Sequence, residues 1–199
     1  MAGRDGGRVP LAPSAVPFSA GSQTPRELSS AEIEGLIEQF ADAARRADRA
    51  GFDVVEIHAA HGYLLHEFLS PIANRRADQF GGTFDNRIRF PLAVAQRVRE
   101  VWPARLPVFV RISATDWVDG GWTADSIEFC RRLSALGIDL IDCSSGGQVP
   151  DATIPAGPGF QVPFAAAIRK EAGIPTGAVG FITDPAQAEQ IVATGQAAA

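Results

Sequence analysis

The sequence has little cysteine, no excess of positive charge and no long hydrophobic run, and each absence removes a class of protein. Its 199 residues contain two cysteines, Cys130 and Cys143, in separate predicted elements, which argues against a disulfide framework and favours a reducing compartment. The net charge of −5 provides no electrostatic footprint for nucleic acid or an anionic membrane. No apolar stretch approaches the about 20 residues of a transmembrane helix.

Other absences concern targeting and cofactors. Residues 1–7 (MAGRDGG) lack the apolar core of a signal peptide, so the cytoplasm is the expected location. No Gly-x-Gly-x-x-Gly follows a predicted strand, which argues against a doubly wound dinucleotide-binding sheet. A zinc site requires three or four ligands, and the cysteines lie far from the two neighbouring histidines, so we expect no metal site.

The residues that are present predict one α/β domain over 1–199. The composition, 46% hydrophobic and 21% charged, is that of an ordinary soluble domain. Residues 1–28 are rich in glycine, proline and serine and are expected to be irregular; residues 29–199 read as β/α units. We expect strands at 53–58, 107–113, 138–145 and 175–180, and helices at 30–50, 61–69, 88–102, 123–136, 164–172 and 185–194.

The repeated strand–helix order predicts parallel strands joined by right-handed crossovers. Polar and glycine-rich residues follow the strands, at the edge where (β/α)8 barrels collect their active sites. Such a barrel has eight strands and typically about 250 residues, whereas this chain shows about four β/α units. The fold class expected is therefore α/β, a partial barrel of the (β/α)8 TIM-barrel type.

The most informative stretch is 54–63 (VVEIHAAHGY), an apolar strand that ends in two histidines and a tyrosine. If the strand stops at His58 and the chain turns through Ala59 and Ala60, the imidazoles of His58 and His61 can converge. Two convergent N–H donors suit a developing oxyanion, and the phenol of Tyr63 is a candidate proton donor. From the pattern alone, a purely structural pair of histidines is an equally good interpretation.

A longer set of motifs resembles the Old Yellow Enzyme family of FMN-dependent ene-reductases, in its bacterial, thermophilic-like branch. The matching segments occur in the family's order from about Val9 onward: 12–18 (APSAVPF), 56–64 (EIHAAHGYL), 68–71 (FLSP), 74–78 (NRRAD), 80–82 (FGG), 86–90 (NRIRF), 110–113 (VRIS), 139–146 (DLIDCSSG) and 177–180 (GAVG).

The resemblance implies roles for four side chains and two backbone positions. His58 and His61 would donate hydrogen bonds to the carbonyl or nitro oxygen of an activated alkene, so that flavin N5 delivers hydride to the β-carbon. Tyr63 would protonate the α-carbon. Arg111 would lie at the flavin pyrimidine edge, and backbone N–H groups at Val179 and Gly180 would help hold the FMN phosphate.

The resemblance thus implies an FMN-dependent NAD(P)H oxidoreductase acting on small α,β-unsaturated substrates such as enones and nitroalkenes. The full-length form is expected to be a homo-oligomer. The family's first strands and its last strand are not matched, so we expect an incomplete chain that, alone, binds FMN poorly and is inactive or oligomerises through two open strand edges.

Three alternatives remain open. One is a dienoyl-CoA reductase or amine dehydrogenase relative on the same barrel, and another is a non-catalytic partial barrel acting as a binding or assembly module. A metal-dependent barrel hydrolase or aldolase is more distant. Among residues without an assigned role, we expect His66 to be structural, Cys143 to be a buried strand thiol, and Arg75 and Arg76 to be solvated. Asp78, Arg87 and Arg89 are expected to pair across the polar loop 74–87.

Overall fold

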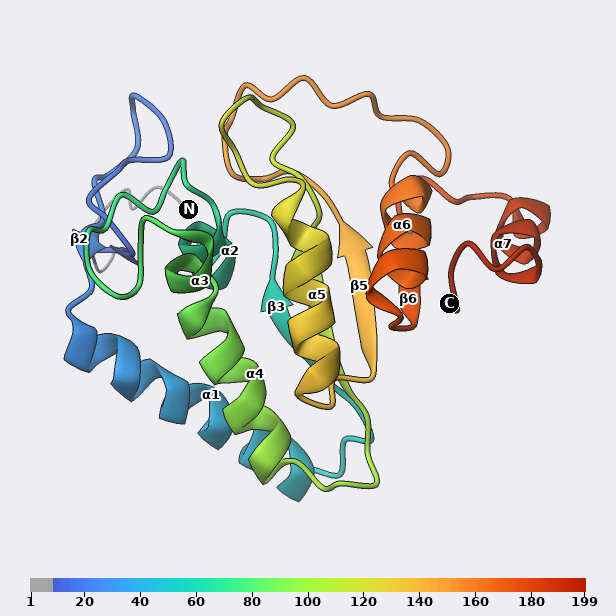
Figure 1. The fold of residues 1–199 in the computed structure, drawn as a ribbon, viewed down its shortest axis with the longest axis horizontal. Helices are drawn as coiled ribbons and strands as arrows, with labels where there is room; N and C mark the ends of the chain where they lie inside the picture. The colour runs from blue at the N-terminus through green and yellow to red at the C-terminus, as the bar shows by residue number, and fades with distance from the viewer. Residues whose placement is uncertain (1–8) are drawn as a thin grey trace.

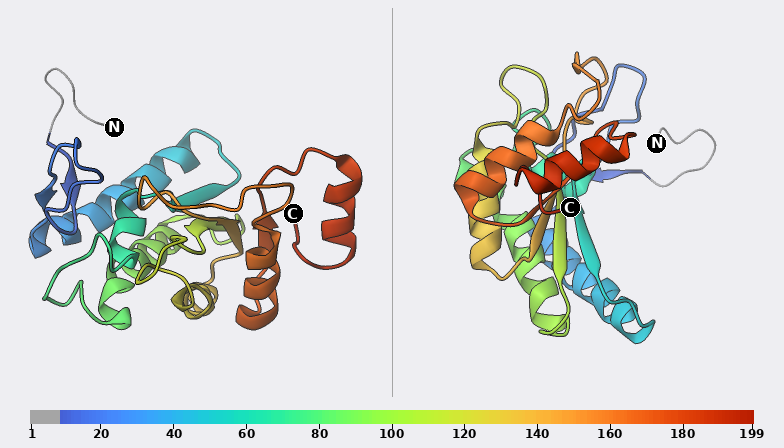
Figure 2. Two further views of the ribbon diagram at one scale, coloured as in Figure 1. Left: turned by 90° about the horizontal axis from the view of Figure 1, so that it is seen from above. Right: turned by 90° about the vertical axis from the view of Figure 1, so that its right-hand side faces the viewer.

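A computed structural model describes residues 9–199. Its centre is a sheet of four parallel strands in the order β3-β4-β5-β6, formed by Val55–Ala59, Val108–Ser113, Leu140–Ser144 and Thr176–Ala178. The helices are α1 (Ser30–Arg49), α2 (Leu64–Leu69), α3 (Phe84–Arg87), α4 (Arg89–Val101), α5 (Asp125–Ala135), α6 (Val162–Ala172) and α7 (Pro185–Ala193). Figure 1 shows the strands pointing toward one edge, where the long loops gather, and Figure 2 gives two further views of the same arrangement. The predicted parallel β/α units are all present.

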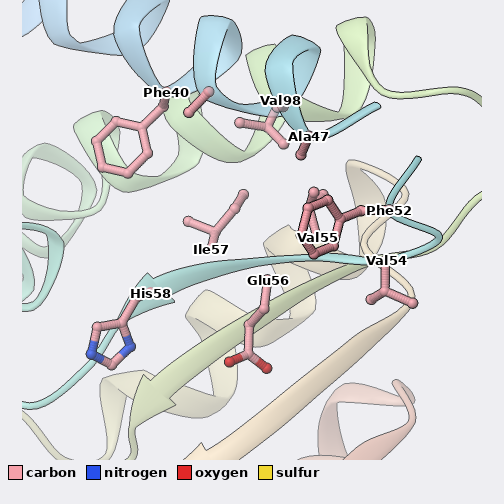
Figure 3. Close-up of a pocket in the computed structure, with 11 residues that line it drawn as sticks. Phe40, Ala47, Phe52, Val54, Val55, Glu56, Ile57, His58 and Val98 are labelled. Carbon is pink, nitrogen blue, oxygen red and sulfur yellow. The ribbon is translucent and has the colours of Figure 1, made fainter. Parts of the chain in front are cut away.

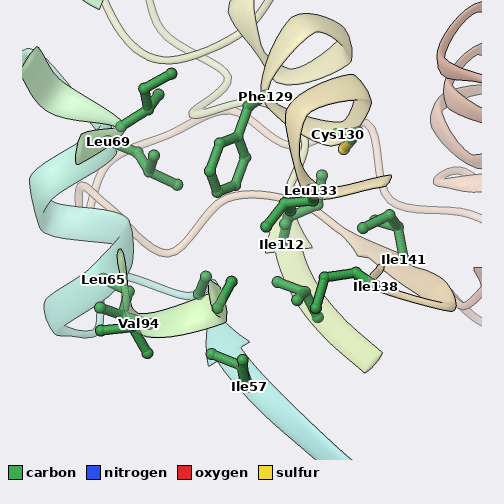
Figure 4. Close-up of a cluster of buried hydrophobic side chains, with 14 of the residues drawn as sticks. Ile57, Leu65, Leu69, Val94, Ile112, Phe129, Cys130, Leu133, Ile138 and Ile141 are labelled. Carbon is green, nitrogen blue, oxygen red and sulfur yellow. The ribbon is translucent and has the colours of Figure 1, made fainter. Parts of the chain in front are cut away.

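Alternation along each strand separates two faces of the sheet. One face carries apolar residues that pack against helices; Figure 4 shows Ile112 and Ile141 near Phe129 and Leu133 of α5, and Ile57 on the side of Val94 of α4. The opposite face carries Glu56, His58, Phe109, Arg111, Leu140 and Asp142, none of which is fully buried. This second face, which would be the interior of a closed barrel, presents the candidate site residues.

The helix boundaries follow from local capping chemistry. Ser29 caps α1 by accepting from the backbone N–H of Glu32, while the Glu32 carboxylate accepts from the Ser29 backbone, a reciprocal capping box. Gly51, at φ +84°, follows the end of this helix. The polar stretch 74–87 is not wholly a loop as expected, because Thr83 caps the short helix α3 by accepting from the backbone N–H of Asn86.

One charged residue in this stretch behaves differently from the prediction. Arg76 is not solvated: it is 8% exposed, donates to the carbonyls of Pro13 and Leu28, and forms an ion pair with Asp78 at 2.6 Å. A buried guanidinium is tolerated when its donors are paired in this way. The expected mutual pairing of Asp78, Arg87 and Arg89 is also wrong, since Arg87 pairs with Asp125 and Arg89 donates to the carbonyl of Gln79.

Arg76 also connects the N-terminal segment to the rest of the fold. Two-residue strands β1 (Leu11–Ala12) and β2 (Arg26–Glu27) pair in parallel, and the segment between them borders the candidate pocket. Residues 9–28 form these two short strands with turns and bends between and around them, and the first eight positions of the segment 1–28 expected to be irregular lie outside the described residues. Through its hydrogen bonds to the Pro13 and Leu28 carbonyls, the Arg76 guanidinium therefore connects both ends of this segment to the polar stretch 74–87.

The two edges of the sheet differ. Beyond β3 the described residues supply no further strand, and an apolar groove of about 460 Å³ runs between β3 and α1 (Figure 3). At the β6 edge, Ala198 donates to the Thr176 carbonyl and Ala199 accepts from the Ala178 N–H, so the expectation of two open edges holds only at β3. No helix within residues 9–199 combines the length and apolarity needed to span a bilayer.

Candidate active site

The predicted pair of histidines converges with the tyrosine at the carboxyl end of β3. The ring centroids of His58 and His61 are 5.1 Å apart, and those of His58 and Tyr63 are also 5.1 Å apart. His58 is the fourth residue of β3, whereas His61 and Tyr63 follow in the turn before α2. The strand runs one residue further than predicted, to Ala59, but the chain turns immediately afterwards, and this turn brings the side chains together.

The turn is possible because its backbone adopts left-handed angles twice in succession. His61 has φ +59° and Gly62 has φ +71°; the first is unusual for a residue with a side chain. Tyr63 N–H donates to the Ala60 carbonyl, and His61 N–H donates to Ser113 Oγ at 3.0 Å. The hydroxyl of Ser113 donates in turn to the Gly146 carbonyl at 2.8 Å. Residues at the ends of β4 and β5 thus fix the turn that follows β3.

The His61 ring contacts β5. Its Nε2 lies 2.7 Å from Ser144 Oγ, and the next residue, Ser145, donates to Gln161 Oε1 at 2.6 Å. Burial lowers the pKa of His61 to about 4, assisted by the charge of Arg111. Burial also lowers the pKa of His58, again assisted by Arg111. Both rings are therefore neutral imidazoles at pH 7, with one N–H donor each.

Arg111 lies beside the histidines on the same face. The strand register aligns His58 with Arg111, Arg111 with Asp142 and Asp142 with Gly177. Arg111 Nε is 3.4 Å from Asp142 Oδ2, yet this buried N–H has no hydrogen-bond acceptor within the described chain. Burial raises the pKa of Asp142, while Arg111 opposes that rise. The guanidinium therefore retains capacity to bind an acceptor-rich ligand.

The remaining predicted positions, Val179 and Gly180, lie two strands from β4, which carries Arg111. Val179 and Gly180 follow β6, and neither backbone N–H donates to another backbone or side-chain group among residues 9–199. Gly180 has φ +111°, and a Cβ there would lie 2.9 Å from the ring of Phe160. The structure does not bring these two residues into contact with His58, His61 or Tyr63. They lie at the same carboxyl edge of the sheet, separated along it.

A pocket of about 430 Å³ opens beside the turn. The N-terminal segment provides one wall, including Phe18, and His61, Gly62, Tyr63 and Glu67 provide much of the other. Tyr63 is 61% exposed, so its hydroxyl is accessible to a small molecule. The N-terminal wall was not anticipated as part of the site, although its apolar residues were the available signal.

Glu67 is a second residue that sequence reasoning missed. It lies on α2, and burial alone raises its pKa to about 7. A carboxyl that is harder to ionise in the folded state than in the unfolded state destabilises the fold as the pH rises through that interval. Its place in the helix expected over 61–69 could be read from the sequence, but the burial of its carboxyl group could not.

We expect Glu67→Gln to stabilise the chain at high pH. The unfolded carboxyl ionises near pH 4.5 and the folded one near 7, so the wild type loses stability between these values and the amide does not. The expected gain is on the order of 2 kcal/mol at pH 8 and near zero at pH 4. Urea unfolding at both pH values measures it, with the exposed Glu34→Gln as control; an equal gain at both pH values would contradict this account.

Comparison with known proteins decides the family. The profile of the NADH:flavin oxidoreductase / NADH oxidase family matches residues 4–198. The chain belongs to this family. It is 54% identical over 188 residues to an NADPH dehydrogenase of Geobacillus thermodenitrificans and 50% identical over 188 residues to that of Bacillus subtilis, covering 94% of this chain in each case. The chain spans 54% and 55% of those curated relatives.

Solved structures agree on the fold. A 2-naphthoyl-CoA reductase in complex with 2-naphthoyl-CoA matches with a TM-score of 0.88 at 30% identity, over 95% of this chain and 30% of that one. Morphinone reductase in complex with tetrahydroNAD matches with a TM-score of 0.77 at 29% identity, over 96% of this chain and 55% of that one. The predicted membership of the Old Yellow Enzyme group and the predicted partial TIM barrel are confirmed.

Proposed function

We propose that this chain carries the substrate-activating half of an FMN-dependent NAD(P)H oxidoreductase that reduces activated C=C bonds, as in enones and nitroalkenes. The observation that supports it most is the convergence of His58, His61 and Tyr63 at the carboxyl end of β3. The family description names a flavin and the curated relatives are called NADPH dehydrogenases, in agreement with the cofactors expected from the resemblance.

The residues present fit FMN at two points. Arg111 offers a buried Nε–H that has no acceptor among residues 9–199, suited to the electron-rich carbonyl edge of a flavin. The backbone N–H groups of Val179 and Gly180, which donate to nothing within the same range, suit a phosphate. The positive φ of Gly180 suits only glycine without strain. FMN, when bound, supplies hydride chemistry to the site.

The chain's own residues then act on the substrate. Two neutral imidazole N–H groups bind the carbonyl or nitro oxygen and stabilise the negative charge that accumulates there as hydride reaches the β-carbon. Their lowered pKa values keep them neutral, so they act as directional donors. The exposed Tyr63 hydroxyl delivers a proton to the α-carbon, which completes the addition of H⁻ and H⁺ across the double bond.

We expect Tyr63→Phe to separate oxygen binding from protonation. General-acid catalysis contributes about 10²–10⁴-fold, so reduction of 2-cyclohexen-1-one should slow at least about 100-fold while KM changes little. The assay uses concentrated chain with excess FMN and NADPH under anaerobic conditions, and follows the saturated ketone by gas chromatography. If NADPH reduces the bound flavin and oxygen reoxidises it, but the enone does not, the result would contradict ene-reduction. It would still support an NADPH-dependent flavin oxidoreductase.

A CoA-thioester reductase is the second candidate, because the 2-naphthoyl-CoA reductase superposes with a TM-score of 0.88. An acyl-CoA substrate would present a thioester oxygen to the same two imidazoles. Replacing the enone by crotonyl-CoA in the same assay distinguishes the two, since preference for the thioester would favour this alternative.

A further inference from the structure

A buried polar network lies directly behind the candidate site. His66 on α2, Asp116 after β4 and Ser70 at the end of α2 are each 0% exposed. Burying a carboxylate and an imidazole is costly unless their polar atoms are satisfied by one another and by neighbours. The sequence predicts that His66 is structural, and its contacts in the fold indicate a more specific role.

The contacts fix the tautomer of His66. The backbone N–H of Gly62 donates to His66 Nδ1 at 2.9 Å, so Nδ1 carries no proton and Nε2 carries it. Nε2 lies 2.9 Å from Asp116 Oδ1, a close contact in which neither atom makes a hydrogen bond of good geometry within residues 9–199. The other oxygen, Asp116 Oδ2, accepts from Ser70 Oγ at 2.6 Å and from the Trp122 backbone N–H at 2.7 Å. Ser70 and Trp122 thereby hold the Asp116 carboxylate beside the ring that receives Gly62.

Gly62 separates His61 from Tyr63, so its position determines both side chains. The left-handed backbone at His61 is strained and persists only where surrounding contacts impose it. Those contacts are His61 N–H to Ser113 Oγ on one side and Gly62 N–H to His66 Nδ1 on the other. Loss of the second would release the turn toward ordinary backbone angles.

We propose that His66, held beside Asp116, is a positioning residue that holds the Gly62 turn and so aims His61 and Tyr63 into the pocket. Its consequence for turnover rests on the proposed function, but the positioning itself is a property of the flavin-free chain. It can therefore be tested without any redox assay.

The test compares His66→Phe with His66→Asn in the flavin-free chain. Phenylalanine keeps a ring but removes both nitrogens, whereas asparagine retains a short acceptor near Nδ1. Both variants remove the imidazole ring nitrogens, so any effect of these on neighbouring titrations cancels in the comparison. The ionisable groups that act on His61 are Arg111, His58 and His66. Phe68→Leu, on the same helix, controls for general destabilisation.

Three results are expected. In the wild type at pH 8, ¹⁵N spectra of the His66 ring show the proton on Nε2. In His66→Phe, exchange of the Gly62 amide accelerates at least tenfold beyond the change in global stability, and the pKa of His61 rises from about 4 toward its usual range. His66→Asn restores much of the amide protection, and Phe68→Leu changes neither quantity.

The proposal is overturned by a wild-type His66 ring protonated on Nδ1. It is also overturned if Gly62 exchange and His61 titration in His66→Phe match those in Phe68→Leu. Should His66→Phe fail to fold, His66→Leu, which also lacks a hydrogen-bond acceptor, replaces it: Gly62 exchange faster than in Phe68→Leu would support the proposal, and equal exchange would overturn it. Absence of flavin binding or ene-reductase activity would leave each of these readouts unchanged, so the two proposals fail separately.

Discussion

Gly62→Ala is expected to destabilise the chain by at least about 3 kcal/mol and to dismantle the turn that carries His61 and Tyr63. A Cβ at this position would lie 2.2 Å from the Gly147 carbonyl oxygen, which is backbone and cannot swing aside. Gly147 is equally confined, because its own Cβ would lie 2.6 Å from His61 Cα. The turn after β3 and the loop after β5 thus meet through two glycines.

Gly173→Ala is the matched control for this substitution. Gly173 has φ +70°, against +71° for Gly62, but a methyl group at Gly173 would have no other atom within 4 Å beyond its chain neighbours. It should lose only the about 1 kcal/mol of left-handed strain. Urea unfolding gives both free energies, and equal losses in the two variants would show that the close approach to Gly147 carries no weight.

Phe68→Ala is expected to cost about 3–5 kcal/mol of unfolding free energy. The Phe68 ring is 0% exposed and packs edge-on against Phe90 of α4, with centroids 4.7 Å apart. Its removal leaves a cavity between α2 and α4, and α2 carries both His66 and Glu67. We therefore expect the pocket to loosen together with the helix.

Phe52→Ala provides the comparison for Phe68→Ala. Phe52 is 61% exposed at the end of the apolar groove beside β3, so its truncation should cost less than about 1 kcal/mol. Thermal or urea unfolding measures both variants. A loss below about 1.5 kcal/mol for Phe68→Ala would place it outside the core and contradict the packing in which α2 is anchored.

The order of strands and helices could be predicted because hydrophobic period, caps and glycine stops agree along this chain. Ser29 and Asp184 cap α1 and α7, at the starts of the helices expected over 30–50 and 185–194. The two-residue strands β1 and β2 were not predicted, since elements this short carry no period. Arg76 was misassigned because its acceptors, the Pro13 and Leu28 carbonyls, lie 63 and 48 residues away.

Half of the candidate site was accessible to sequence reasoning. His58, His61 and Tyr63 converge because the strand stops and the chain turns; the turn was predicted through Ala59 and Ala60, whereas its left-handed residues are His61 and Gly62. The groups that hold them, Ser113, Ser144 and Asp116, come from later strand ends and become neighbours only through the parallel register. Their serine and aspartate identities alone indicated only polar loops. Burial of Cys143, by contrast, was predicted, and it raises the pKa of that thiol to about 12.

The candidate site residues are spread along the carboxyl edge of the sheet. Arg111 lies in the same register row as His58, whereas Val179 and Gly180 lie beyond β6. Arg111 and these backbone N–H groups are the residues that would hold a flavin at the carboxyl edge of the strands.

The most direct test is titration of FMN into the purified 199-residue chain, followed by visible absorption and flavin fluorescence. The account predicts saturable but weak binding that desalting reverses, and at least tenfold weaker binding in Arg111→Met than in the wild type. The exposed Arg49→Met, which removes a charge far from the site, should bind as the wild type does. An unperturbed flavin spectrum, or identical binding by Arg111→Met and the wild type, would contradict the assignment of this face of the sheet to the flavin.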